Sequence, residues 1–192
     1  MSAPTIVIPS RTAQRRRELF FGTALGTAGV LMTMLTLVGA YIGAANAAGS
    51  DWLASNTIPL TQPNVMMFCL ALSVVMIHWA VYAINNDDRT STYVALAATL
   101  VLGAAFVNMT IFLWHQIGIT ADQPEGPYFY ALTGAHVALV VVAMVSIVLV
   151  GFRALAGQYS SRNPDGIAAA ALLWDAAVAV YAVIWVAVYI MK

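Results

Sequence analysis

Four ionisable side chains lie inside long apolar stretches of the sequence, and they are the first candidates for chemistry. They are Asp175, His78, His115 and His136. Within a bilayer such groups are expensive unless they are paired, neutralised or directed toward a polar interior. A carboxylate or an imidazole in this setting could handle protons, contact a partner, or only hydrogen-bond to a neighbouring helix. The residues alone leave these roles open.

Asp175 and His78 stand at similar depths in two different apolar segments. At a rise of 1.5 Å per residue, Asp175 is about 14 Å and His78 about 10 Å from the same membrane surface. Their depth and complementary chemistry predict a contact between the two side chains. Asp175 then either handles protons or contacts a partner, or it is a neutral acid bonded to a neighbouring helix.

His115, beside Trp114, and His136 lie toward the opposite surface in consecutive apolar segments. Two histidines on neighbouring helices could bind haem axially, which would make the chain a small haem or quinone electron carrier. Helical cytochromes usually place these ligands deeper and give the haem propionates basic partners, and the loops on this side contain no arginine. Hydrogen bonding between helices is the alternative role for His115, His136 and Trp114.

No pattern in the sequence indicates a catalytic centre. We find no nucleophile beside a base, no carboxylate pair within one helical turn and no phosphate-binding loop. Cys69 is the only cysteine, so it forms neither an intrachain disulfide nor a thiolate metal site. The formal net charge is zero, and no basic or acidic domain suggests nucleic acid. We therefore predict no catalytic, cofactor-binding or metal-binding residue in this chain.

The elements that position these side chains are predicted to be membrane-spanning helices. Hydrophobic residues make up 61% of the 192 residues and charged residues 8%, against about 25% charged in soluble domains. A helix needs about 20 apolar residues to cross the hydrocarbon core, where backbone groups must pair within the segment. We predict one all-α integral membrane domain, residues 1–192, with five transmembrane helices. The spans are about 19–46, 64–85, 93–117, 128–152 and 166–191.

Basic residues predict the direction of these spans. With the N-terminus in the cytoplasm, all arginines are cytoplasmic and only Lys192 is external. This asymmetry favours an N-in, C-out course by the positive-inside rule. The external loops would then carry only acids: Asp51, Asp122 and Glu125.

Small residues in the first span are spaced for close helix packing. Gly22 with Gly26, and Gly39 with Gly43, each form a Gly-xxx-Gly pair. Such pairs let two helix backbones approach closely. The partner helix could belong to this chain or to another protein.

Motifs in the last four spans give the chain a resemblance to a known family. They are Asn64 with His78-Trp79-Ala80; Leu102-Gly103-Ala104-Ala105-Phe106 with Trp114-His115; Tyr130-Ala131-Leu132-Thr133-Gly134-Ala135-His136; and Trp174, Trp185 and Val188-Tyr189. In this order the chain resembles subunit III of the haem–copper terminal oxidases, in its short, five-helix bacterial form. The likeness covers most of residues 20–190.

The resemblance implies a non-catalytic subunit of a respiratory oxidase in a bacterial plasma (inner) membrane. Such a subunit carries no haem or copper, which belong to its partners. It packs mainly on catalytic subunit I, which reduces oxygen to water and pumps protons, within a complex that also contains subunit II. It binds phospholipid and helps to sustain proton uptake. The complex would be an oxidoreductase and translocase, while this chain would not be catalytic alone. A membrane scaffold or transport protein is a further alternative to the electron carrier.

Several ionisable residues common in the family are replaced here. Val30 and Leu113 stand where membrane glutamates are common, Leu139 where a histidine is common, and Val178 where an aspartate is common. Asp175 stands where the resemblance leads us to expect a histidine. The chain is therefore a divergent member, and we do not carry over the proton-related roles of those family residues.

Overall fold

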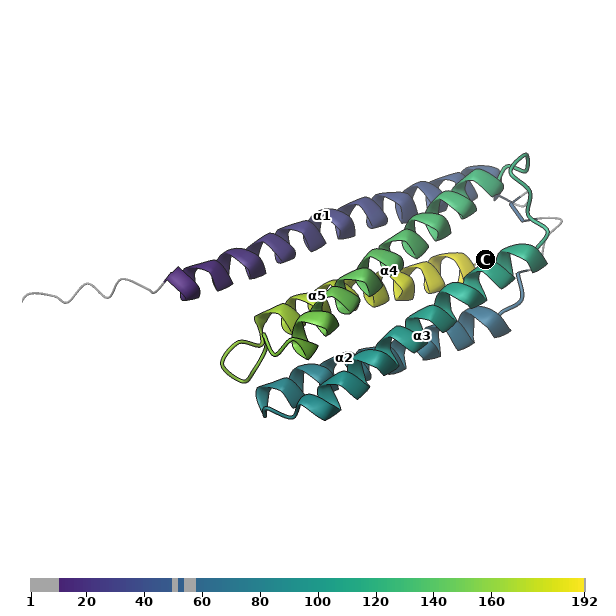
Figure 1. Ribbon diagram of the computed structural model, residues 1–192. Coiled ribbons are helices and arrows are strands. Elements are labelled where there is room, and N and C mark those ends of the chain that lie inside the picture. The colour runs from purple at the N-terminus through teal and green to yellow at the C-terminus, as the bar shows by residue number, and fades with distance from the viewer. Residues whose placement is uncertain (1–10, 50–51, 54–57, 192) are drawn as a thin grey trace, which may run out of the picture.

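The computed structural model describes residues 11–49, 52–53 and 58–191 and forms a helical bundle (Figure 1). Asp51 and Lys192, which enter the predicted charge distribution, lie outside the described residues. The elements are α1 (Arg11–Ala48), α2 (Thr61–Asn85), α3 (Arg89–Gln116), α4 (Gly126–Leu155), α5 (Asp165–Ile184) and the π-helical segment η2 (Trp185–Ile190). No β-strand element occurs in the described part of the chain.

Five helices in the described residues are long and apolar enough to cross a membrane, with α5 and η2 forming one continuous span. This confirms the predicted all-α membrane fold. The helices extend past several predicted span limits. For example, α1 begins at Arg11, although the apolar run begins near Leu19. Hydrophobicity limits the span, whereas backbone hydrogen bonding continues through the arginine and glutamine residues, which are good helix formers.

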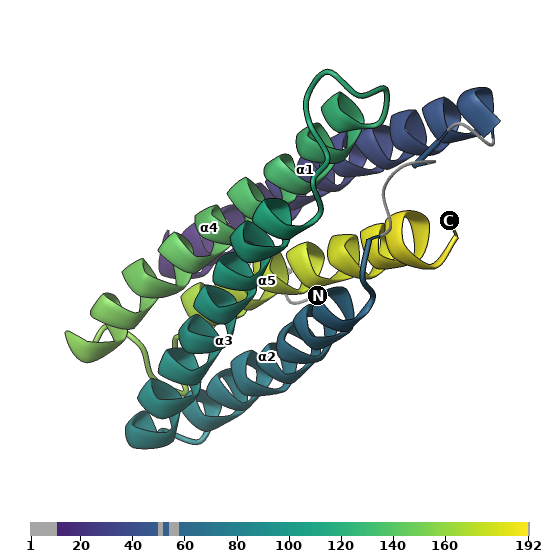
Figure 2. The same ribbon diagram turned by 90° about the vertical axis from the view of Figure 1, so that its right-hand side faces the viewer.

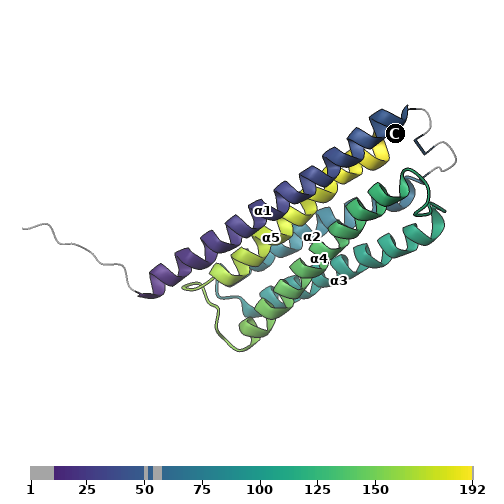
Figure 3. The ribbon, with the colours of Figure 1, turned by 90° about the horizontal axis from the view of Figure 1, so that it is seen from above.

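Helix α5 is the centre of the bundle. It packs against α1, α2 and α4, while α2 and α3 form an antiparallel hairpin and α3 also contacts α4. Figure 2 shows the α2–α3 hairpin beside α5, and Figure 3 shows α1 beside α5 with α3 on the opposite side of the bundle. In its most apolar window, 61% of the α5 span is buried, against 17% for α1. The α5 span is therefore the most enclosed of the five.

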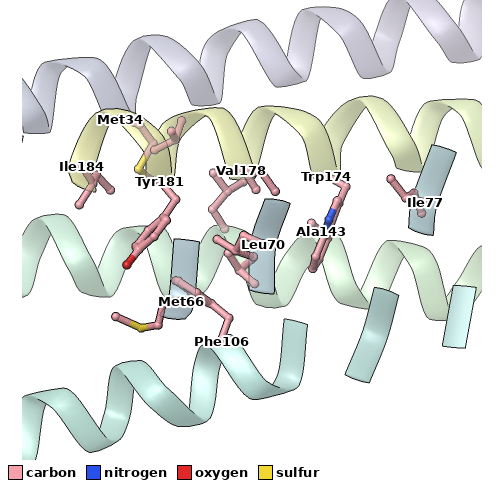
Figure 4. Packing of buried hydrophobic residues seen from close by; sticks show 14 of the residues in the cluster. Met34, Met66, Leu70, Ile77, Phe106, Ala143, Trp174, Val178, Tyr181 and Ile184 are labelled. Atoms are coloured by element: carbon pink, nitrogen blue, oxygen red, sulfur yellow. The ribbon is translucent and has the colours of Figure 1, made fainter. Parts of the chain in front are cut away.

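Apolar side chains from α2, α3 and α4 fill the space around α5. Figure 4 shows Trp174, Val178 and Tyr181 of α5 together with Leu70 of α2 and Phe106 of α3. All five side chains belong to the buried cluster. Lipid is as apolar as this core, so the bundle depends on close packing and interhelical hydrogen bonds more than a soluble domain does.

The glycine pairs of α1 do not pack inside the chain. Gly22, Gly26, Gly39 and Gly43 are exposed, and a Cβ atom added at any of them would meet no heavy atom within 4 Å. Of the two alternatives left open by the sequence, packing against another helix of this chain is excluded for the described residues, and packing against another protein stays a prediction. Helix α1 contacts α4 and α5 through other residues, among them Met34, Val38 and Tyr41, which are buried.

Two connections meet at one end of the bundle, which we name the arginine end because Arg89, Arg153 and Arg162 lie there. Asp87, in the turn between α2 and α3, accepts hydrogen bonds from the Ser161 amide at 2.8 Å and the Ser161 hydroxyl at 2.6 Å. These bonds hold the pKa of the exposed Asp87 carboxyl below its ordinary value. The α2–α3 turn is thereby tied to the loop between α4 and α5.

Candidate functional site

Trp174 joins the central helix to the α2–α3 hairpin. Its indole Nε1 donates a hydrogen bond to Ser73 Oγ at 2.9 Å, and Ser73 Oγ in turn donates to the Leu70 carbonyl at 2.6 Å. The ring lies against Gly103 of α3, where an added Cβ atom would stand 2.7 Å from Trp174 Cη2 and 3.2 Å from Met144 Sδ. Gly103 is thus required by the close approach of the indole, since real Cβ contacts are longer than this.

His136 connects α4 to its neighbours inside the bundle. Its Nε2 lies 2.9 Å from the carbonyl oxygen of Ala177. A carbonyl only accepts, so Nε2 carries the proton and donates it from α4 to α5. The imidazole also lies between two aromatic rings, with centroids 5.4 Å from Phe106 and 5.4 Å from Tyr181. With 2% of its surface exposed, the side chain is enclosed by partners from α3 and α5.

Trp114 and His115 behave differently although they are adjacent. The half-buried Trp114 donates from Nε1 to Thr133 Oγ1 at 3.2 Å and packs edge-on against Tyr130. His115 is exposed in the last turn of α3. No hydrogen bond or ring contact joins His115 to His136 among the residues that the structure describes. The two histidines are therefore not brought together as a pair.

His78 and Asp175 are brought together, as their matched depth predicted. His78 Nε2 lies 3.0 Å from Asp175 Oδ2, which links α2 to α5. The pair is only partly enclosed, with 56% of the His78 side chain and 33% of the Asp175 side chain exposed. The second carboxyl oxygen, Asp175 Oδ1, is buried and has no hydrogen-bond partner among the described residues.

Two further contacts fix the other end of the last span. Trp185 Nε1 donates to Asn64 Oδ1 at 2.9 Å, and the Tyr181 hydroxyl donates to the Pro63 carbonyl at 3.2 Å. Trp185 begins the π-helical segment η2, where the Met191 amide bonds to the Val186 carbonyl. Sequence reasoning quoted Asn64 and Trp185 as separate motifs but did not pair them. It also missed Ser73 and Tyr181, because a lone serine or tyrosine in an apolar helix gives no signal of its partner.

The replaced family positions lie in or beside the apolar core. Leu113, Leu139 and Val178 are buried members of the core cluster, and Val30 packs against it. In the described part of the chain, no group of three or more His, Cys, Asp or Glu side chains could hold a metal ion. The polar contacts that do occur connect helices to one another.

Fold and contacts together define a multi-pass helical membrane protein whose buried polar groups hold α5 against its neighbours. The family described as "Cytochrome c oxidase subunit III" matches residues 24–192 of the chain. Because this match covers most of the sequence, the chain belongs to the cytochrome c oxidase subunit III family. The motif resemblance is thereby confirmed.

Individual relatives agree with this assignment. The chain is 28% identical over 145 residues to "Cytochrome c oxidase subunit 3" of Petromyzon marinus, which covers 73% of this chain and 56% of the relative. It is 27% identical over 135 residues to "Probable cytochrome c oxidase subunit 3" of Rickettsia conorii, covering 69% and 48% respectively. The matches thus span about half the length of these relatives. The low identity fits a divergent member.

Proposed function

We propose that this chain is the non-catalytic subunit III of a respiratory haem–copper oxidase. In this role it stabilises a catalytic subunit I, its main contact, within a complex that also contains subunit II. Haem and copper belong to those partners, where oxygen is reduced to water and protons are translocated. The chain itself contributes a rigid helical bundle to the assembly.

One observation carries the proposal: the motif residues that the chain shares with the family make its interhelical contacts. His136 bonds α4 to α5, and Trp185 bonds the last span to α2. Gly103 makes room for Trp174 at the centre of the bundle. These side chains serve the packing of the bundle, as expected for a subunit with an architectural role. The alternative of an electron carrier gains no support, because the Nε2 of His136 is committed to the Ala177 carbonyl.

Bound phospholipid is part of the proposal. A cavity of about 260 Å³ lies at the arginine end between α1, α4 and α5. Arg153 and Tyr159 line its polar part, while Leu149, Val150 and Leu173 continue into the apolar part. A basic side chain above an apolar surface suits a lipid phosphate and its acyl chain. We further propose a bacterial plasma membrane with the arginine end in the cytoplasm, supported by the basic residues and the Rickettsia relative.

The test is mild-detergent purification of the oxidase through an affinity tag on this chain. We expect a haem–copper subunit I to co-purify, identified by mass and by its haem spectrum. Purification without any haem–copper subunit would contradict the proposal. A haem absorption band that belongs to the isolated chain would instead support the electron-carrier alternative.

A further inference from the structure

The His78–Asp175 pair lies well inside the membrane. Asp175 is ten positions beyond the first residue of α5, and His78 is seven positions before the last residue of α2. At 1.5 Å per residue these positions are about 10–15 Å from the arginine end of the helices. The hydrocarbon core is about 30 Å thick. The exposed part of this pair therefore faces hydrocarbon unless another protein covers it.

One ring nitrogen of His78, Nδ1, has no hydrogen bond within the described part of the chain. Nε2 is engaged by Asp175, and no other hydrogen bond to His78 occurs among the described residues. More than half of the His78 side chain is exposed. Lipid tails offer neither donors nor acceptors, so an unsatisfied polar group costs several kcal/mol in this setting. The described residues offer His78 Nδ1 no polar partner, which points to one from another protein.

The positions of the protons in the His78–Asp175 pair determine which kind of partner His78 Nδ1 needs. The pair is electrically neutral either as Asp175 carboxylate with His78 imidazolium, or as Asp175 carboxylic acid with neutral His78. In the first state both ring nitrogens carry protons. In the second, Nε2 accepts from the carboxyl group, and the proton of the neutral ring is on Nδ1. A third neutral state, with Nε2–H donating to Oδ2, would leave the carboxyl proton on Oδ1, which is buried and has no partner among the described residues. The two states that avoid this unsatisfied hydroxyl both present an Nδ1–H donor, and the partner then supplies an acceptor.

The surroundings of the pair suit a helix. On α2, Val75 and Ala71 are exposed one and two turns before His78, and on α5 Ala179 is exposed one turn after Asp175. Small side chains allow a transmembrane helix to approach closely. We name these five residues (Ala71, Val75, His78, Asp175 and Ala179) the His78–Asp175 face.

The outer face of α3 and α4 provides a contrast. Its cavity of about 480 Å³ is lined by apolar residues, among them Val107, Ile111 and Val145, and by the neutral amide Asn108. None of the residues lining it is ionisable. Lipid chains are sufficient to cover such a surface.

We propose that the His78–Asp175 face docks a transmembrane helix of another subunit of the oxidase, and that this helix places a hydrogen-bond acceptor against His78 Nδ1. The acceptor is a hydroxyl, amide or carboxylate side chain. The inference rests on the proposed function, because it requires an oxidase complex, and it names the surface by which this chain joins that complex.

The test uses a photo-crosslinking amino acid in the complete chain, expressed with its partners and irradiated in native membranes. Val75, on the His78–Asp175 face, is 60% exposed, and Val142 of α4 is a matched control at 59%. We expect a crosslink from position 75 to an identified oxidase subunit and none from position 142. Crosslinks from position 75 only to lipid, or to a second copy of this chain, would overturn the inference.

Substitutions measure the same contact. We expect Val75→Trp to reduce recovery of the partner subunit about tenfold, because a bulky side chain overpacks a tight interface, while Val142→Trp leaves recovery unchanged. The double variant His78→Leu with Asp175→Leu should also reduce recovery without unfolding the chain. Equal recovery for both tryptophan variants would contradict the inference. If the unsubstituted chain recovers no oxidase subunit, the proposed function itself has failed.

Discussion

His78 and His136 are the same residue type inside the same membrane bundle, yet their surroundings are opposite. His136 is 2% exposed, donates to Ala177 and contacts two aromatic rings. The His78 side chain is 56% exposed and has one partner, Asp175. A polar group that the chain encloses serves its own fold. A polar group that the chain leaves exposed within the membrane indicates where another protein binds.

Truncating His136, the enclosed histidine, should have the largest effect on the free energy of unfolding. We expect His136→Ala to lower the free energy of unfolding by about 2–4 kcal/mol, because it removes the ring contacts and leaves a cavity. His78→Ala should cost about 1 kcal/mol or less in the isolated subunit, since it removes one partly exposed interhelical bond. Unfolding of both variants in mixed detergent micelles measures the difference. Equal losses of unfolding free energy at the two positions would contradict the contrast between an enclosed and an exposed histidine.

Adding a methyl group beside the buried Trp174 ring should have an intermediate effect on the free energy of unfolding. Gly103→Ala places a Cβ atom 2.7 Å from the Trp174 ring, and we expect a loss of about 1–3 kcal/mol from overpacking. Gly134→Ala is the matched control, because nothing lies within 4 Å of its added Cβ atom. The same unfolding measurement applies. A Gly103→Ala variant as stable as the control would show that the interior near His136 is less tightly packed than the structure indicates.

Weakening the Asp87–Ser161 hydrogen bonds at the arginine end should have the smallest effect on stability. The lowered pKa of Asp87 means that its bonds to Ser161 favour the folded state above the ordinary carboxyl pKa. That contribution is lost as the pH falls through the lowered pKa. We expect protection of the Ser161 amide from hydrogen exchange to weaken in acid.

Asp87→Asn is a suitable control for this tie. Asp87 has a φ of 56°, a left-handed conformation that asparagine also tolerates. The variant should show weak Ser161 protection at every pH. If its pH dependence equalled that of the unsubstituted chain, a group other than Asp87 would be responsible.

The sequence predicted the spans and one side-chain pair because both depend on position along a helix. Depth follows from counting residues, and depth alone suggested His78 with Asp175. Most other contacts depend on the rotation of each helix about its axis, which residue counts leave undetermined in uniformly apolar helices. For this reason Trp174 could not be paired with Ser73 in advance. The glycine pairs of α1 left open whether their partner belongs to this chain, and only the helix rotation shows that they face outward.

The close approach of Trp174 to Gly103 has an evolutionary consequence. The indole ring and any side chain at position 103 compete for the same space. A larger residue at position 103 is therefore tolerated only after the tryptophan has been replaced by a smaller ring. We expect these two positions, 71 residues apart in the sequence, to change together during divergence, with the tryptophan changing first.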